Sequence, residues 1–153
     1  MKLKSTLAIL ALAVSNHAAF AADTSGPATR ADPMMERYSA AAERQDWKGA
    51  AAAMQAAVDK EPGNADFHSL YAYSLRKGGT QDMDLVFKHY NEALRIDPRH
   101  KGAHEYLGEA YLQVGNVAKA REELSALDKL CFFGCSEYNE LKRSISEHEA
   151  KAK

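Results

Sequence analysis

The chain has 153 residues, and its 20 basic and 21 acidic side chains give it a formal net charge of −1. This near-neutral balance excludes a protein that binds nucleic acid through bulk positive charge. Hydrophobic residues make up 46% of the chain, charged residues 27% and aromatic residues only 8%. Much of the apolar content is alanine, so the composition is typical of a globular helical protein.

The first 21 residues have the three parts of a secretory signal peptide. Lys2 and Lys4 form a basic start, an apolar run covers residues 7–14, and an Ala-Phe-Ala motif ends at Ala21. The apolar run is much shorter than the roughly 20 residues that a membrane-spanning helix needs. We therefore predict cleavage near Ala21, a periplasmic or secreted protein, and a flexible small-residue linker over residues 22–31.

An internal repeat organises residues 32–153. The segments VDKEP at 58–62 and LRIDP at 94–98 each end in a proline that terminates a helix, and a third copy has Phe132 in place of the proline. The turn within each copy recurs at Gln45, Gly79 and Gly115. The basic period is 34 residues, and the second copy carries two extra residues between positions 80 and 84. Each copy predicts two helices joined by a short turn.

The third copy carries the clearest motif. It reads His104-x-x-Leu107-Gly108-x-x-Tyr111, followed by Ala120-x-x-x-Leu124. This motif resembles the tetratricopeptide repeat (TPR), whose pattern is W-x-x-L-G-x-x-Y and then A-x-x-x-F. The resemblance implies an all-α fold, a right-handed α-solenoid of helix-turn-helix repeats. The repeats are expected at about 32–62, 65–98 and 101–131.

A capping helix is predicted after the third repeat, over about 137–150. Tyr138, Leu141, Ile145 and His148 recur at helical spacing on one face, and Ser136 is a candidate N-cap. Such a helix covers the apolar end of the last repeat. The acidic residues of this region are interpreted as solvated helix surface; they are Glu122, Glu123, Glu147 and Glu149.

Cys131 and Cys135 flank the turn before the capping helix. In an exported protein we expect them to form a structural disulfide, because Gly134 lets the chain turn back so that the sulfurs meet. Redox catalysis and metal binding are the alternatives. The C-x-x-C spacing of thiol oxidoreductases is absent, and two cysteines supply only half of a zinc site.

His100 and His104 are four residues apart at the start of a predicted helix, a spacing that can hold a transition metal. No third ligand is evident beside them, and His68 and His104 occupy the tryptophan position of the repeat pattern, so packing between helices is the simpler interpretation. No nucleophile elbow, phosphate loop or metalloprotease motif is present. We therefore expect no enzymatic activity, no cofactor and no metal.

The resemblance implies a concave groove, lined by the first helix of each repeat, that holds a peptide or helix of a partner. The groove positions in this sequence are Ser39, Glu43, Asp66, Ser69, Tyr73, Arg76, Lys77, Glu105, Glu109, Leu112 and Gln113. The groove is expected to be basic near Arg76 and Lys77 and acidic near Glu105 and Glu109. One subclass of the family binds a partner's C-terminal carboxylate with Lys and Asn residues. That clamp is missing here, because its positions hold Met35, Ser39, Leu70, Gly102 and Tyr106.

The leading hypothesis is a non-enzymatic protein–protein interaction module or assembly scaffold in the periplasm. The alternative is an accessory protein for periplasmic metal or thiol-redox handling, which would use His100 and His104 or Cys131 and Cys135. The sequence does not distinguish binding of a different protein from self-association. It predicts no nucleic-acid partner, and no membrane partner once the signal peptide is removed.

Overall fold

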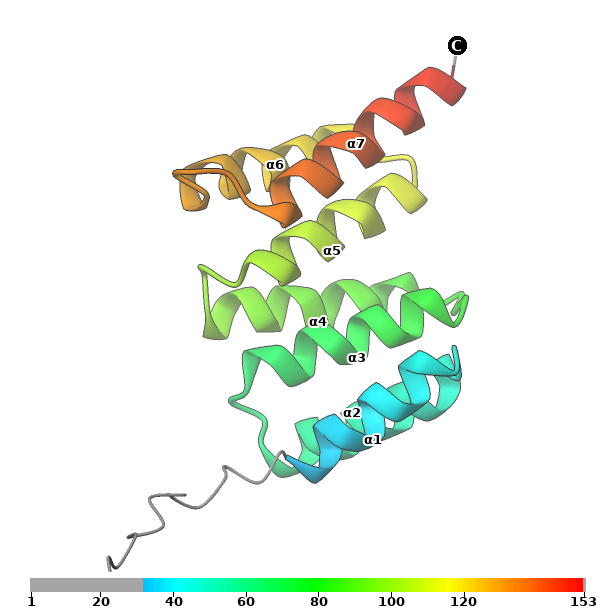
Figure 1. The fold of residues 1–153 in the computed structure, drawn as a ribbon. Helices are drawn as coiled ribbons and strands as arrows, with labels where there is room; N and C mark the ends of the chain where they lie inside the picture. Colours follow the sequence, from blue (N-terminus) through cyan, green and yellow to red (C-terminus); the bar gives the residue numbers. More distant parts are fainter. Residues whose placement is uncertain (1–31, 153) are drawn as a thin grey trace, which may run out of the picture. The chain divides into compact units, whose positions relative to one another are not determined.

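The computed structural model describes residues 32–152, which form seven α-helices (Figure 1). The helices are α1 (Pro33–Glu43), α2 (Trp47–Lys60), α3 (Ala65–Lys77), α4 (Met83–Ile96), α5 (Lys101–Gln113), α6 (Val117–Leu130) and α7 (Ser136–Lys151). The predicted all-α solenoid is confirmed: three helix pairs follow one another and α7 covers the last of them. The predicted signal peptide and linker lie outside the described residues.

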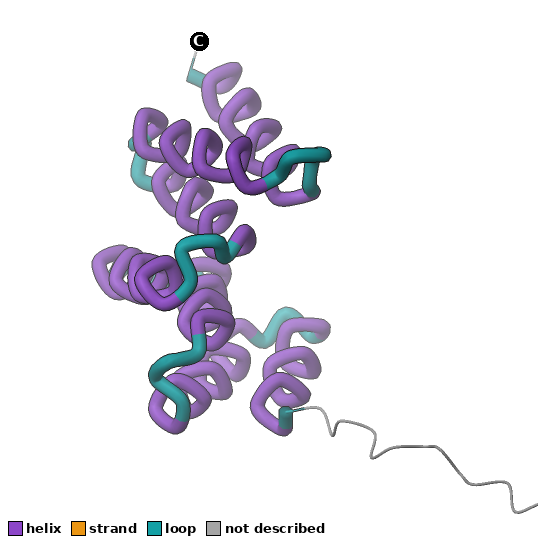
Figure 2. The backbone as a smooth tube through the Cα atoms, turned by 90° about the vertical axis from the view of Figure 1, so that its left-hand side faces the viewer, coloured by secondary structure: helices purple, strands orange, loops and turns teal. Residues whose placement is uncertain are grey.

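The odd-numbered and even-numbered helices lie on opposite faces of the solenoid. Helix α3 contacts α5, and α5 contacts α7, whereas α2, α4 and α6 make no contact with one another; α1 contacts α2 but not α3. Helices that touch line the inside of a curved stack, and helices that spread apart lie outside. The two views show this stacking of successive helix pairs (Figures 1 and 2). We call the surface formed by α1, α3, α5 and α7 the inner groove.

Polar caps define where the helices begin. In each of the first six helices the N-cap side chain accepts a hydrogen bond from a backbone N–H of the first turn; the caps are Asp32, Asp46, Asn64, Asp82, His100 and Asn116. Helix α7 is different, because its N-cap is Cys135, which makes no such bond. The prediction of Ser136 as N-cap is therefore wrong. Cys135 is extended and Ser136 is already the first helical residue, with its hydroxyl turned to Glu137.

The turns within the repeats lie where the sequence places them. Gln45, Gly79 and Gly115 all have positive φ, at 57°, 75° and 76°. Glycine adopts this conformation without strain, whereas Gln45 does so at some cost. The connections at 44–46 and 114–116 contain three residues each, and the one at 78–82 contains five, so the two extra residues of the second repeat lengthen this turn.

Small residues let the helices approach closely. Ala50, Ala57, Ala72, Ala93 and Ala120 are completely buried. Helices α5 and α7 approach closely, because a Cβ atom on Gly108 would lie 2.5 Å from the Cδ2 atom of Leu141. Leu141 and Ile145 are buried against α6 and the end of α5, so α7 closes the core of the third repeat. Within residues 32–152, no helix combines the length and apolarity needed to cross a membrane.

Candidate functional site

A solvent-open cavity of about 290 Å³ lies in the inner groove between the C-terminal halves of α3, α5 and α7. Four predicted groove residues line it: Arg76, Glu109, Leu112 and Gln113. The other lining residues come from α7: Ser144, Glu147, His148 and Lys151. The sequence predicts α7 only as a capping helix and interprets its Glu147 as solvated surface. In the structure, α7 is also one wall of the groove.

Arg76 and Glu109 form an ion pair in this cavity. A guanidinium nitrogen of Arg76 lies 2.5 Å from Glu109 Oε2, and the hydroxyl of Ser144 donates to Glu109 Oε1 at 3.4 Å. The Arg76 side chain is only 11% exposed. The expectation of a basic region at Arg76 and a separate acidic region at Glu109 is therefore wrong, because the two charges neutralise each other across the second and third repeats.

Tyr90 lies beneath this ion pair. Its ring is completely buried, and burial raises the pKa of its phenol strongly even though the Arg76 guanidinium beside it acts in the opposite direction. Neither Tyr90 Oη nor Arg76 Nε has a hydrogen-bond partner of normal geometry among the described residues. Unpartnered buried polar atoms cost free energy, so Arg76 is held under the groove by its ion pair with Glu109.

Aromatic side chains extend the groove toward α1. The rings of Tyr73 and Tyr106 have centroids 4.6 Å apart, and Trp47 meets Tyr73 edge-on at 5.7 Å. The cations of Arg76 and Lys77 lie 5.6 Å and 6.0 Å from the Tyr73 centroid. Cations within about 6 Å of a ring face are attracted to it. The groove therefore already holds cations over one of its aromatic faces.

Glu105 is a partly buried carboxylate at the other end of the aromatic surface. Within residues 32–152 it has no hydrogen bond and no ion pair. Burial raises the pKa of Glu105 to about 7, and repulsion by Glu109, Glu137 and Glu140 acts in the same direction. The same burial, together with the charge of Glu105, raises the pKa of Tyr106 to about 12. A cation would be stabilised at this position.

The remaining predicted groove residues divide by exposure. Ser39, Glu43, Asp66, Lys77 and Gln113 are exposed on the odd-numbered helices. Leu112 is nearly buried but forms part of the cavity floor. Ser69 is only 1% exposed, so the prediction that it contacts a partner is wrong. Its hydroxyl is enclosed by the fold and has no hydrogen-bond partner in the described part of the chain.

His68 and His104 have the same structural role in successive repeats. His68 Nε2 lies 3.0 Å from the carbonyl of Pro62, and His104 Nε2 lies 3.1 Å from the carbonyl of Pro98. Each ring therefore fixes the junction with the preceding repeat, as the packing interpretation predicts. His104 Nδ1 also lies 2.7 Å from Glu123. Glu123 is thus a partly buried hydrogen-bond partner, and its prediction as solvated surface is wrong.

The ring nitrogens of His100 are also engaged inside the fold. Nδ1 accepts from the Ala103 amide and caps α5, and Nε2 lies 3.0 Å from Asp66 of the second repeat. All four ring nitrogens of His100 and His104 thus have partners. Among the described residues, no group of three His, Cys, Asp or Glu side chains is arranged to hold a metal ion.

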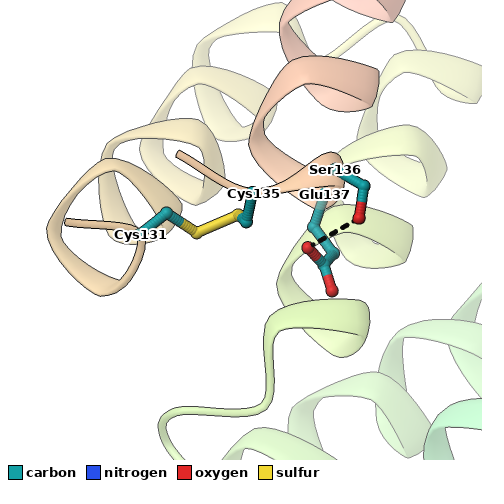
Figure 3. Close-up of a disulfide and its surroundings, with 4 residues drawn as sticks. All are labelled: Cys131, Cys135, Ser136 and Glu137. Atoms are coloured by element: carbon teal, nitrogen blue, oxygen red, sulfur yellow. Dashed lines mark hydrogen bonds between the residues drawn. A yellow bond between two sulfur atoms is a disulfide. The ribbon is translucent and has the colours of Figure 1, made fainter. Parts of the chain in front are cut away.

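The Sγ atoms of Cys131 and Cys135 lie at bonding distance, 2.02 Å, in the turn between α6 and α7 (Figure 3). Gly134 has a φ of 84°, the left-handed conformation that brings the chain back to α7. The small loop places Phe132 and Phe133 in solvent, at 87% and 96% exposure. The link fixes the start of α7, the helix that lines the cavity.

These features define an α-solenoid of helix-turn-helix repeats with a groove on its inner face. Two family models, both described as tetratricopeptide repeat, match residues 37–82 and 81–145. The chain belongs to the tetratricopeptide repeat family, as its sequence motif predicts. No curated protein matches the chain significantly.

Solved TPR structures share the fold at low sequence identity. The TPR2B domain of yeast Sti1, in complex with an Hsp70 peptide, has a TM-score of 0.68 and 21% identity, over 77% of this chain and 94% of that one. The first TPR domain of Spaghetti (RPAP3), bound to the HSP90 peptide SRMEEVD, has a TM-score of 0.65 and 17% identity, over 76% and 90%. The Yersinia enterocolitica type III secretion translocator chaperone SycD has a TM-score of 0.64 and 18% identity, over 78% and 94%.

Proposed function

We propose that this chain is an exported, non-enzymatic interaction module that holds a peptide or helix of a partner protein in its inner groove. The observation that carries the proposal is the groove itself: a cavity of about 290 Å³ beside the aromatic surface that Tyr73 of α3 and Tyr106 of α5 form. Two of the similar folds hold peptides, from Hsp70 and HSP90, and supply an analogy for this use of the fold.

The groove has the composition of a protein-binding surface. Tyr73 and Tyr106 provide aromatic area, which contributes strongly to affinity at interfaces, and Trp47 at the start of α2 packs edge-on against Tyr73. Lys77 and Gln113 provide exposed polar groups at the rim. The Arg76–Glu109 ion pair keeps the floor electrically neutral and fixes its shape before a partner arrives. A fixed surface of this kind loses little conformational entropy on binding.

Site-specific crosslinking in the native cell tests the proposal. A photo-crosslinking amino acid at Gln113, which lines the cavity, should trap one discrete partner. The same amino acid at Arg121, exposed on α6 of the outer face, is the matched control and should trap none. Equal trapping at both positions, or trapping at Arg121 alone, would contradict a role for the inner groove.

Export is tested separately on the protein from the same cells. N-terminal sequencing should begin at Ala22, because cleavage is proposed after Ala21. The processed chain should appear in the periplasmic or secreted fraction. A protein that retains Met1 and stays with the cytoplasmic fraction would refute the proposed location without affecting the groove.

A further inference from the structure

The inner groove contains an acceptor site that the fold itself leaves unfilled. Glu105 has no hydrogen bond or ion pair within residues 32–152, although it is partly buried. The hydroxyls of its aromatic neighbours, Tyr73 and Tyr106, likewise have no hydrogen-bond partner in the described part of the chain. None of these polar atoms is among the buried unpartnered atoms of the described residues, so the carboxylate and both hydroxyls are open to a ligand in the groove.

Three cations of α3 and α7 are engaged elsewhere. Arg76 is paired with Glu109 at 2.5 Å. Lys77 lies over the rings of Trp47 and Tyr73, at 5.7 Å and 6.0 Å. On α7, Arg143 pairs with Glu140 and Glu147. None of these side chains forms an ion pair with Glu105. The charge of Arg76 stabilises its ionised form only in part, because the pKa of Glu105 stays raised.

We propose that this part of the groove binds a lysine or arginine side chain of the partner, held by the Glu105 carboxylate and the rings of Tyr73 and Tyr106. The inference rests on the proposed function and specifies its partner as one with a basic segment. An ammonium or guanidinium group donates hydrogen bonds to the carboxylate and hydroxyl oxygens and is attracted to the ring faces.

The electrostatics of the groove also favours a basic ligand over an acidic one. The pKa of Glu105 is about 7 because burial and the charges of Glu109, Glu137 and Glu140 disfavour its ionised form. A bound cation would offset that cost, whereas an acidic segment would add to it. The acidic peptide SRMEEVD, bound by the first TPR domain of Spaghetti, represents the opposite chemistry on a similar fold. The residues that would clamp such a carboxylate are replaced here, for example by Leu70 and Gly102.

The test uses a random library of twelve-residue peptides displayed on phage and selected against the purified chain. Selected peptides should be enriched in lysine or arginine, and amide chemical shifts should place them in the inner groove. Their affinity should fall at least tenfold in Glu105→Gln, which keeps the shape of the side chain and removes its charge. Glu122→Gln, on the outer face beside Lys119, is the matched control and should bind as the unchanged protein does.

The outcomes separate this inference from the proposed function. Peptides that bind in the groove without basic residues, or equally well to Glu105→Gln, would overturn the inference and leave the groove as a binding site. Selection of acidic peptides that bind in the groove would likewise overturn the inference and leave the groove as a binding site. If no selected peptide binds in the groove, the proposed function fails and the inference fails with it.

Discussion

The guanidinium of Arg76 and the carboxylate of Glu109 join the second and third repeats through an ion pair of 2.5 Å beneath the inner groove. Both side chains were expected at the groove surface as separate charges. Their pairing means that a change at Arg76 alters the fold and the groove together, so exposed residues such as Gln113 report on binding more cleanly.

Arg76→Ala should destabilise the protein by about 2 kcal/mol, because it leaves Glu109 without its counter-ion in a partly buried site. Urea unfolding followed by circular dichroism measures this change. Arg95→Ala is the control, since Arg95 forms an exposed pair with Glu92 within one helix and should leave the midpoint unchanged within error. Equal unfolding midpoints for the two variants would show that the Arg76–Glu109 pair contributes no more to stability than an exposed ion pair.

Gly108→Val should destabilise the protein by about 2 kcal/mol, because the new side chain collides with the buried Leu141 side chain. In a Leu141→Ala background the same change should cost clearly less, since the colliding methyl groups are gone. Gly63→Val is the control, as a Cβ there meets no atom within 4 Å. A cost of Gly108→Val that does not depend on residue 141 would contradict the close approach of α5 and α7.

The cysteine pair should contain no free thiol in protein purified without reductant and two after reduction, as a thiol assay measures. Replacing Cys131 and Cys135 together by serine should lower the free energy of unfolding by at most about 2 kcal/mol, the chain-entropy value for so short a loop. The loss should appear first as faster amide exchange in α7. Two free thiols before reduction would contradict the disulfide.

His104 should titrate above its ordinary pKa of 6.5. Burial opposes its charge, but hydrogen bonds to Glu123 and to the Pro98 carbonyl outweigh that effect and raise the pKa. The folded state therefore binds this proton more tightly, so its stabilisation is complete below pH 6.5 and is lost as the pH rises through the higher folded value. Glu123→Gln should cost about 1–2 kcal/mol at pH 6 and less at pH 9.

An NMR titration of the imidazole protons tests this assignment directly. His89 is an internal reference, because burial and the neighbouring His68 lower its pKa to about 4. A His104 pKa at or below 6.5, or an equal effect of Glu123→Gln at both pH values, would contradict the charged hydrogen bond.

Features that depend on local sequence were predictable. The proline stops, the turn residues and the alanine positions recur with the repeat, and each acts through backbone conformation or close packing within one unit. This is why Gln45 could be matched to Gly79 and Gly115 although it is not a glycine, and why its positive φ follows from its position.

Features that depend on pairing across repeats were not predictable. The partners of Arg76 and His104 lie 33 and 19 residues further along the chain. Helical periodicity relates only residues of one helix, so it does not predict these pairs. The place of α7 in the groove depends on how far it approaches α5, and that distance is set by Gly108 and by the turn at Cys131–Cys135. A repeat pattern alone contains no such information.

The most direct measurement of the central claim is the affinity of the crosslinked partner for groove and outer-face variants, by isothermal titration calorimetry. Tyr73→Ala removes aromatic surface from the inner groove and should weaken binding at least tenfold while the helical circular dichroism signal is retained. Glu122→Gln on α6 should bind as tightly as the unchanged protein. Unchanged affinity in Tyr73→Ala together with weakened binding in Glu122→Gln would contradict the account, because it would place the partner on the outer face.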